Sequence, residues 1–125
     1  MYFVRLHSCK TKMIERPWGT YEVLQSRDDN FLLKKIVVNP QQRLSLQSHE
    51  HRSEHWVIVS GQGEVTVGED VIICGLNTHV FIPRGAKHRI HNTSSDALLI
   101  FVEVQIGNIL DENDIVRYQD DYCRT

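Results

Sequence analysis

The sequence predicts an all-β domain whose sheet closes into a barrel or a packed double sheet. From about Tyr21 onward, apolar residues recur in short runs, mostly with a period of two, as strands with one buried face require. Gly, Asn, Asp and Pro separate these runs, and no long helical stripe is found. Many short antiparallel strands must protect their edges, and closure is the usual way to do so.

The period-two runs locate the strands along the chain. We expect strands at residues 21–24, 31–38, 43–47, 55–60, 64–67, 71–74, 80–82, 88–91 and 97–106. Residues 1–14 lack clear periodicity and are predicted to form an N-terminal arm, either mobile or added as a strand to a partner subunit. Residues 15–125 are predicted to form the single domain. Within it, the polar segment 111–118 is expected to be a short helix or turn seated on the barrel.

Composition limits the classes of function. A chain of 125 residues, 41% hydrophobic and 24% charged, fits one soluble domain. The net charge is −2, and basic and acidic residues are interspersed along the chain, so no nucleic-acid partner is expected. No run of residues approaches the ~20 apolar residues of a membrane span. Cys9, Cys74 and Cys123 match neither a disulfide framework nor a paired-cysteine zinc site, which favours a reducing cytoplasm.

Polar side chains with metal-binding chemistry gather in two short segments. If residues 43–47 form a strand, Gln47 and His49 point to one face, together with Arg43 and Ser45. Glu54 opens the next strand after a short reversal, which would return its carboxylate over Gln47 and His49.

The second segment could supply a fourth ligand. His88 follows the turn Pro83-Arg84-Gly85 and could approach from a neighbouring strand. A mixed nitrogen and oxygen set suits zinc, iron, manganese, cobalt or nickel better than calcium. The nearby residues His51, His55 and His91 are expected to be surface groups or groups that orient a ligand.

The spacing of these residues resembles the two cupin motifs, with Gln in place of the usual first His. The matching positions are Gln47-x-His49-x-x-x-x-Glu54-x-x-x-x-x-x-Gly61 and Pro83-x-Gly85-x-x-His88-x-x-x-Asn92. Four further tracts narrow the likeness: Arg16-Pro17-Trp18-Gly19-x-Tyr21, residues 43–49, residues 51–56 and Asp114-Ile115-Val116-Arg117-Tyr118. Together they resemble the C-terminal cupin domain of type II phosphomannose isomerases, which is often fused to a mannose-1-phosphate guanylyltransferase.

This resemblance implies a cupin double-stranded β-helix, that is, a jelly-roll barrel, with a divalent metal, usually zinc. It implies interconversion of mannose 6-phosphate and fructose 6-phosphate, and a homodimer. Position by position, the metal ligands would be Gln47, His49, Glu54 and His88. The Gly-rich nucleotide loop of the guanylyltransferase is absent from this sequence, so guanylyl transfer is not expected. The chain departs from the usual motifs where Gly is preferred, at Gln41, Asn77 and Cys123.

An aldose–ketose isomerase needs a proton-transfer group and charge stabilisation beside its metal. Glu103 shares a strand face with Gln105 in an otherwise apolar run, so we expect a buried carboxyl with a raised pKa and assign it, with Arg52, as catalytic. His51 and His55 compete for the proton-transfer role. For the substrate phosphate, the expected partners are Arg43, Lys87 and Arg89, with Arg52 a further candidate.

Two other classes of function are compatible with the same residues. One is a cupin that binds a sugar or sugar nucleotide without turnover, and the other is a different cupin enzyme, such as an epimerase or a dioxygenase. The Gln-His-Glu-His set speaks against a dioxygenase, which commonly uses three histidines or two histidines and one carboxylate.

Overall fold

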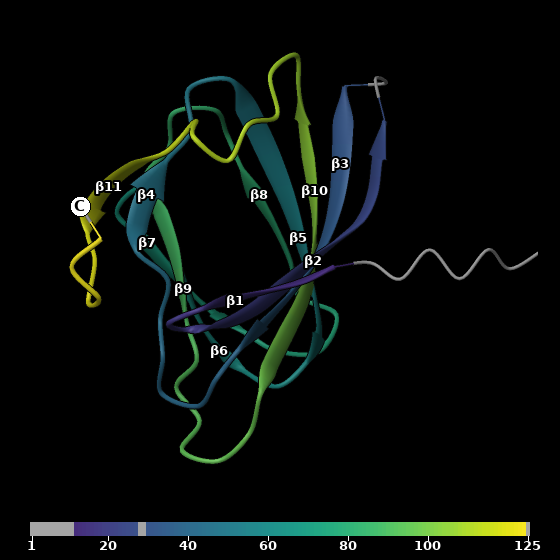
Figure 1. Ribbon diagram of the computed structural model, residues 1–125. Helices are drawn as coiled ribbons and strands as arrows, with labels where there is room; N and C mark the ends of the chain where they lie inside the picture. The colour runs from purple at the N-terminus through teal and green to yellow at the C-terminus, as the bar shows by residue number, and fades with distance from the viewer. Residues whose placement is uncertain (1–11, 28–29, 125) are drawn as a thin grey trace, which may run out of the picture.

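The computed structural model describes residues 12–27 and 30–124, and these residues form two antiparallel sheets that face each other (Figure 1). Most of the predicted N-terminal arm, including Cys9, lies outside the described residues. Within the described part of the chain, no helix is long and apolar enough to span a membrane.

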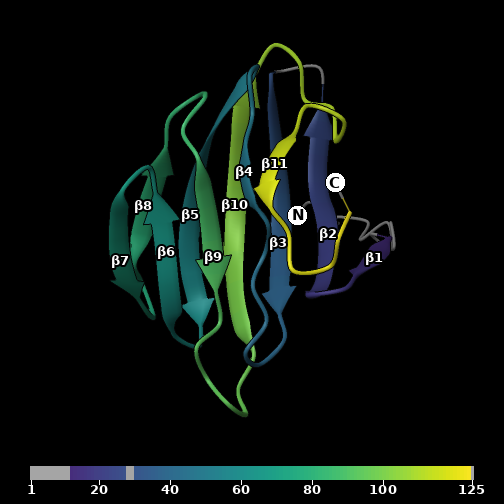
Figure 2. The same cartoon turned by 90° about the vertical axis from the view of Figure 1, so that its left-hand side faces the viewer.

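The larger sheet has six strands in the order β1-β2-β3-β10-β5-β8. Their bounds are Met13–Arg16 (β1), Gly19–Arg27 (β2), Phe31–Val38 (β3), Leu99–Gly107 (β10), Arg52–Ser60 (β5) and His79–Ile82 (β8). The smaller sheet has five strands in the order β11-β4-β9-β6-β7. These are Val116–Gln119 (β11), Leu46–Ser48 (β4), His88–His91 (β9), Gly63–Val67 (β6) and Asp70–Cys74 (β7), and Figure 2 shows this sheet in front of the larger one.

Three adjacent strands of the larger sheet divide the interior into an apolar half and a polar half. In β10, Leu99, Phe101, Glu103 and Gln105 are buried in alternation, as predicted from the period-two pattern. The register pairs Phe101 with Ile36 and Ile58 on either side, in the apolar half. In the polar half it pairs Glu103 with Lys34 and Trp56, and Gln105 with Leu32 and Glu54.

The apolar half contains the core that holds the sheets together. Its fully buried members include Trp56, Ile58, Ile90, Leu99 and Phe101, and the rings of Trp56 and Phe101 lie 4.8 Å apart. Burial of large apolar side chains stabilises the fold by roughly 1.5–3 kcal/mol each. Trp56 borders both halves, because it also pairs with Glu103, and residues such as Ile58, Leu99 and Phe101 support the polar half from the apolar side.

The ends of the described chain differ from the prediction. Met13 and Ile14 were expected in the N-terminal arm, but together with Glu15 and Arg16 they form β1, which pairs within the same chain against β2. Segment 111–118 was expected to be a short helix or turn. Its first part does form a turn, in which the N–H of Asp114 donates to the carbonyl oxygen of Asp111, but its second part belongs to β11 and pairs with β4. Both are four-residue edge strands in which most side chains are exposed, so a period-two pattern of burial is nearly absent.

Two glycines of the cupin motifs occupy backbone positions that favour glycine. Gly61 has a φ of +84°, and a Cβ at this position would lie 2.3 Å from the carbonyl oxygen of Leu98. Gly85 has a φ of +79°, and its N–H donates to the carbonyl oxygen of His49, 2.8 Å away. The second glycine thus ties the turn before β9 to the segment that follows β4.

The three positions at which this chain departs from the motif glycines share one backbone property. Gln41, Asn77 and Cys123 have φ values of 62°, 70° and 55°. This left-handed region is strained for residues other than glycine, least for asparagine. The preference for glycine at these three positions therefore has a conformational cause.

Candidate metal centre

His49, Glu54 and His88 meet between the two sheets, although they come from three segments. His49 follows β4, His88 begins β9 in the same sheet, and Glu54 lies in β5 of the opposite sheet. One potential ligand atom from each residue lies within 4.8 Å of the other two, and all three residues are buried. These residues form a group that could hold a metal ion.

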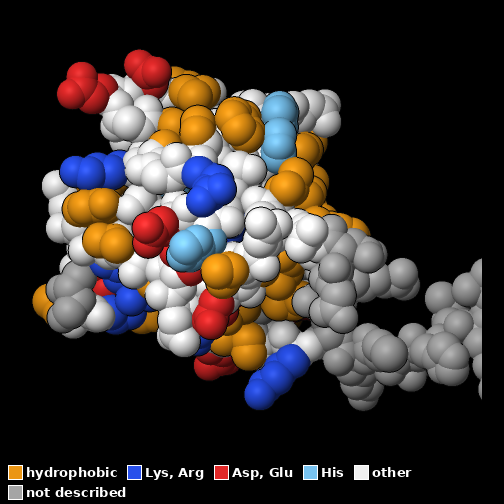
Figure 3. Space-filling model, turned by 90° about the horizontal axis from the view of Figure 1, so that it is seen from above, with side chains coloured by type: hydrophobic (Ala, Val, Ile, Leu, Met, Phe, Trp, Pro, Cys, Tyr) orange, Lys and Arg blue, Asp and Glu red, His pale blue; other side chains and the backbone are white. Residues whose placement is uncertain are grey.

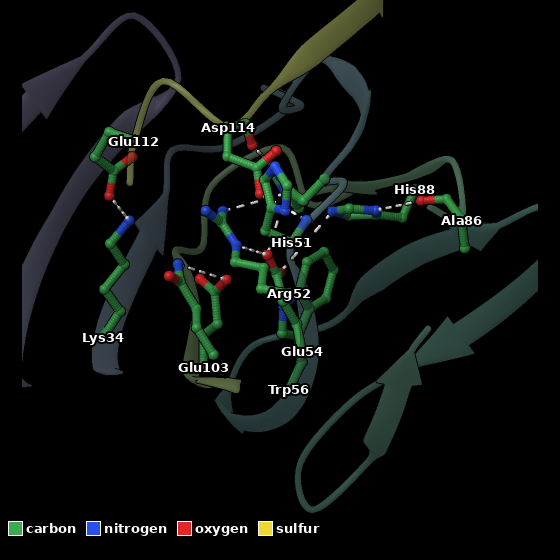
Figure 4. A network of polar contacts seen from close by, with 12 residues as sticks. Lys34, His51, Arg52, Glu54, Trp56, Ala86, His88, Glu103, Glu112 and Asp114 are labelled. Carbon is green, nitrogen blue, oxygen red and sulfur yellow. Dashed lines mark hydrogen bonds and ion pairs between the residues drawn. The ribbon is translucent and has the colours of Figure 1, made fainter. Parts of the chain in front are cut away.

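His88 presents an acceptor nitrogen without a partner. Its Nδ1 lies 2.9 Å from the carbonyl oxygen of Ala86 (Figure 4), and because a carbonyl can only accept, Nδ1 carries the proton. The Nε2 atom therefore has a free lone pair, and it is buried with no hydrogen-bond partner among the described residues. Burial lowers the pKa of His88, which favours the neutral imidazole that a metal requires.

His49 is held in the same tautomer by a different element. Its Nδ1 donates to the carbonyl oxygen of Asp114, 2.7 Å away, so that Nε2 is directed towards Glu54. Nε2 lies 3.1 Å from Oε2 of Glu54. The Arg52 guanidinium donates to both of these atoms, from Nη2 to Nε2 of His49 at 3.2 Å and from Nε to Oε2 of Glu54 at 2.9 Å, so its positive charge offsets the repulsion between their lone pairs.

Glu54 is the ionised member of the group. Burial alone would raise its pKa, but hydrogen bonds involving His49 and Glu103 and the charges of His88 and Arg52 outweigh burial and lower the pKa well below its ordinary value. Arg52 donates from Nε to Oε2 at 2.9 Å, and Trp56 donates from Nε1 to Oε1 at 2.9 Å. The carboxylate is thus fixed in position before any metal binds.

Gln47 lies beside the group. It pairs directly with His88 across β4 and β9, which places the two side chains on the same face, and it lines the pocket around the group. The side-chain amide oxygen of Gln47 is a suitable neutral fourth donor. The donor set of two imidazoles, one carboxylate and one amide fits zinc or a similar divalent transition metal.

Glu103 is buried in the same pocket with the opposite ionisation behaviour. Burial, the negative charge of Glu54 and a hydrogen bond with Glu54 raise the pKa of Glu103 well above its ordinary value. Gln105 donates from Nε2 to Oε1 of Glu103 at 3.2 Å. The two carboxyls, Glu54 and Glu103, therefore differ in charge because of their environments.

The segment before β11 closes over one side of the group. The Asp114 carboxylate accepts backbone hydrogen bonds from Glu50 and His51, each 2.9 Å long. Glu112 forms an ion pair with the buried Lys34 (Figure 4). This connection lies at the top of Figure 1, and Figure 3 looks down on it, where charged side chains of both signs gather with histidine.

The three residues predicted to contact phosphate do not line this pocket. Arg43 forms a bidentate ion pair with Asp121, with N–O distances of 2.7 and 2.9 Å. The ammonium of Lys87 lies over the ring of Tyr118, 4.2 Å from its centroid. The Nε of buried Arg89 donates to the carbonyl oxygen of Leu44, and the guanidinium also contacts Gln119.

Arg43 was expected on the same strand face as Gln47 and His49, but the alternation of faces does not extend to it. Arg43 makes only an isolated bridge to His91, and the regular strand β4 begins at Leu46. Leu44 and Ser45 are both buried and both line the pocket, so residues 43–45 do not alternate between two faces.

Other basic residues surround the pocket instead. The pocket is partly open to solvent and has a cavity volume of about 80 Å³. Besides Arg52, its basic lining residues are Arg16, Lys34, Arg117 and Arg124. Arg16 and Arg117 belong to sequence tracts that resemble the family. Their place in the pocket lining could not be predicted, because it depends on strands β1 and β11, which were not expected. His51, His55 and His91, which were expected to be surface groups or groups that orient a ligand, do not line the pocket. The ring of His55 stacks on that of His79.

The two facing sheets and their buried ligand group define the class of the protein as a cupin domain. Solved structures support the fold. Oxalate decarboxylase from Bacillus subtilis has a TM-score of 0.77 and 17% identity, covering 87% of this chain and 30% of that one. A cupin-2 domain from Rhodospirillum rubrum has a TM-score of 0.65 and 24% identity, covering 78% of this chain and 68% of that one.

The chain belongs to the Mannose-6-phosphate isomerase C-terminal family, whose model matches residues 5–120. It is 45% identical to the Xanthan biosynthesis protein XanB of Xanthomonas campestris over 91% of this chain and 24% of that protein. It is 40% identical to the Mannose-1-phosphate guanylyltransferase of Escherichia coli over 89% of this chain and 23% of that protein. The chain thus spans about a quarter of the length of these relatives.

Proposed function

We propose that this chain is a metal-dependent sugar-phosphate isomerase that interconverts mannose 6-phosphate and fructose 6-phosphate. The observation that carries the proposal is the partnerless Nε2 of His88, buried within reach of His49 and Glu54, which line a pocket together with Glu103. The resemblance of the chain to phosphomannose isomerases supplies the reaction, and the pocket contains the groups that this reaction needs.

Gln47, His49, Glu54 and His88 would hold the metal. When bound, a divalent metal supplies Lewis-acid stabilisation of negative charge on the sugar oxygens. The guanidinium of Arg52 lies beside these ligands, with Nη2 3.2 Å from Nε2 of His49. Arg52 would therefore add a fixed positive charge next to the reacting oxygens.

Glu103 would transfer the proton between carbons. Its ionised form takes the proton from C2 of the aldose, the electrons of the C–H bond form the C=C bond of an enediol, and Glu103 returns the proton to C1. The hydroxyl proton on O2 moves to O1 in the same sequence, so the atoms balance. A carboxyl whose pKa is raised above its ordinary value is a stronger base when ionised, and it can therefore take up a proton and return it.

The charge of the lining supports an anionic substrate. Five basic side chains, from Arg16, Lys34, Arg52, Arg117 and Arg124, outnumber the three acidic ones, Glu54, Glu103 and Glu112. A neutral sugar would gain little from such a lining.

A coupled assay with mannose 6-phosphate, run on metal-loaded and chelator-treated protein, tests the proposal. We expect turnover that chelator abolishes and added zinc restores. Glu103→Gln should lower turnover by about 10²- to 10⁴-fold, while the exposed carboxyl variant Glu69→Gln serves as the matched control. Bound metal without turnover would contradict the isomerase and favour a non-catalytic cupin that binds a sugar or sugar nucleotide.

Zinc as the native metal, a homodimer and a cytoplasmic location are further proposals from the resemblance. Elemental analysis of protein purified without added metal tests the first. Light scattering coupled to size-exclusion chromatography tests the second, with twice the chain mass of 14.5 kDa expected. Fractionation of the native cells tests the third.

A further inference from the structure

We propose that Arg117 and Arg16 bind the phosphate group of the substrate, with Arg117 as the deeper of the two contacts. This inference rests on the proposed function, because it identifies where a sugar phosphate would place its phosphate. It departs from the sequence-based expectation, which assigned phosphate to Arg43, Lys87 and Arg89.

Arg117 has a buried donor that nothing satisfies. Its Nε atom is inaccessible to solvent and has no hydrogen-bond partner among the described residues. An unsatisfied buried donor on a charged group costs more than on a neutral one, so such groups normally have a partner. Because Arg117 lines the pocket, a ligand anion is the natural partner.

Charge pairing separates Arg117 and Arg16 from the other basic residues of the lining. Arg52 is paired with Glu54, Lys34 with Glu112, and Arg124 with Asp120. No described carboxylate lies within ion-pair distance of Arg117 or Arg16. Arg16 donates to the Tyr21 hydroxyl at 3.3 Å and to the carbonyl oxygen of Glu15, so its positive charge is not neutralised. These two guanidiniums are free to bind an anion.

The sheet register places Arg117 at a suitable distance from the metal centre. Arg117 pairs with Gln47 across β11 and β4, and Gln47 pairs with His88 across β4 and β9. The three residues form a row on one face, so Arg117 lies two strand spacings from His88, about 10 Å along the sheet. A sugar 6-phosphate has its charged group at the opposite end from C1 and C2, which matches this separation.

Arginine also has the right geometry for this ligand. Its planar guanidinium can donate two parallel hydrogen bonds to phosphate oxygens, and the Nε atom of Arg117 would be one of these donors. Arg16 is exposed at the opening of the pocket and would contact the same group from the solvent side. The phosphate would then lie at the mouth and the reacting carbons at the metal.

Isothermal titration calorimetry with mannose 6-phosphate and with inorganic phosphate tests the assignment on metal-loaded protein. We expect Arg117→Gln to weaken both affinities by about 10- to 100-fold, as loss of a charge-assisted contact predicts. Arg16→Gln should weaken them about threefold, and Arg117→Lys should restore part of the loss. Metal content, measured on each variant, should stay at the wild-type value and so shows that the domain is folded.

Two comparisons make the result decisive. Arg84→Gln, an exposed arginine outside the lining, is the matched control and should bind like the wild type. Arg43→Gln tests the sequence-based assignment. Wild-type affinity in Arg117→Gln, or a larger loss in Arg43→Gln, would overturn the inference. Because binding is measured without turnover, an inactive protein with intact phosphate affinity would refute the isomerase and leave this site standing.

Discussion

His49 donates its Nδ1 proton to the backbone carbonyl of Asp114, and this contact lets a segment 65 residues away determine which nitrogen of a candidate ligand is free. The carboxylate of the same Asp114 accepts the N–H groups of Glu50 and His51. These hydrogen bonds outweigh the effect of burial and lower the pKa of Asp114, so it is ionised at neutral pH.

Asp114→Ala should weaken metal binding by about 10- to 100-fold, which is the range for residues that orient metal ligands. The reason is that the loop no longer holds the backbone beside His49, although His49 itself is unchanged. Competition with a chromogenic chelator measures the affinity. Asn113→Ala is the neighbouring control, and equal metal affinity in both variants would show that Asp114 has no orienting role.

Metal removal should lower the melting temperature of the wild type. A ligand that binds only the folded state at 100 times its dissociation constant adds about 2.7 kcal/mol of stability. His88→Gln should abolish this dependence, because the Nε2 donor is lost. Differential scanning calorimetry with and without chelator provides the measurement. A chelator effect of wild-type size in His88→Gln would remove His88 from the ligand set.

Glu54→Gln should destabilise the metal-free protein by about 3–5 kcal/mol, because it leaves the buried guanidinium of Arg52 without its counter-charge. Urea unfolding of the metal-free variant measures this loss. The double variant Glu54→Gln, Arg52→Met should recover part of it. If the double variant is no more stable than the single one, the loss has another cause.

Glu103→Gln, unlike Glu54→Gln, should stabilise the metal-free protein, but it should lower the turnover number. As a proton-transfer group, Glu103 would contribute about 10²- to 10⁴-fold to the turnover number. The expected result is a loss of that size at unchanged metal content. Full turnover in the variant would remove Glu103 from the mechanism.

The contribution of Glu103 to the stability of the metal-free protein should fall as pH rises above 4.5, the ordinary value for its carboxyl. The folded state keeps the Glu103 proton because its pKa is raised, whereas the unfolded state releases it, so unfolding is favoured at higher pH. Glu103→Gln has no proton to release. The stability advantage of the variant should therefore grow with pH, by up to about 1.4 kcal/mol per pH unit. A pH-independent difference in urea unfolding would contradict the raised pKa.

The left-handed residues offer a test independent of the metal. Gln41→Gly and Cys123→Gly should each stabilise the fold by about 0.5–1 kcal/mol, because relief of backbone strain exceeds the entropy cost of glycine. Asn77→Gly should change stability less, since asparagine tolerates this conformation. Thermal unfolding of the three variants checks the order. A loss of stability in both Gln41→Gly and Cys123→Gly would show that side-chain contacts outweigh strain there.

The sequence was most informative where a strand has one buried face over its whole length. For β3 and β10 the alternation predicted both the strands and the burial of Glu103. It was least informative at the edges. β1 and β11 have no continuous buried face, and they are stabilised by pairing with β2 and β4, which is a tertiary property.

The same limit applies to the site. The cupin spacing predicts which residues could meet, and the structure brings His49, Glu54 and His88 together. The spacing could not indicate that Asp121 forms an ion pair with Arg43, or that Arg117 has no carboxylate partner among the described residues. Both depend on how the last residues of the described chain fold back.

The division of β3, β5 and β10 into an apolar half and a polar half has an evolutionary consequence. Residues such as Phe101 and Ile58 secure the sheets from one end, so replacement of Lys34, Glu103 or Gln105 at the other end leaves that anchor intact. Selection can therefore change the polar residues of the pocket while the fold is retained, which is how one fold can acquire many activities.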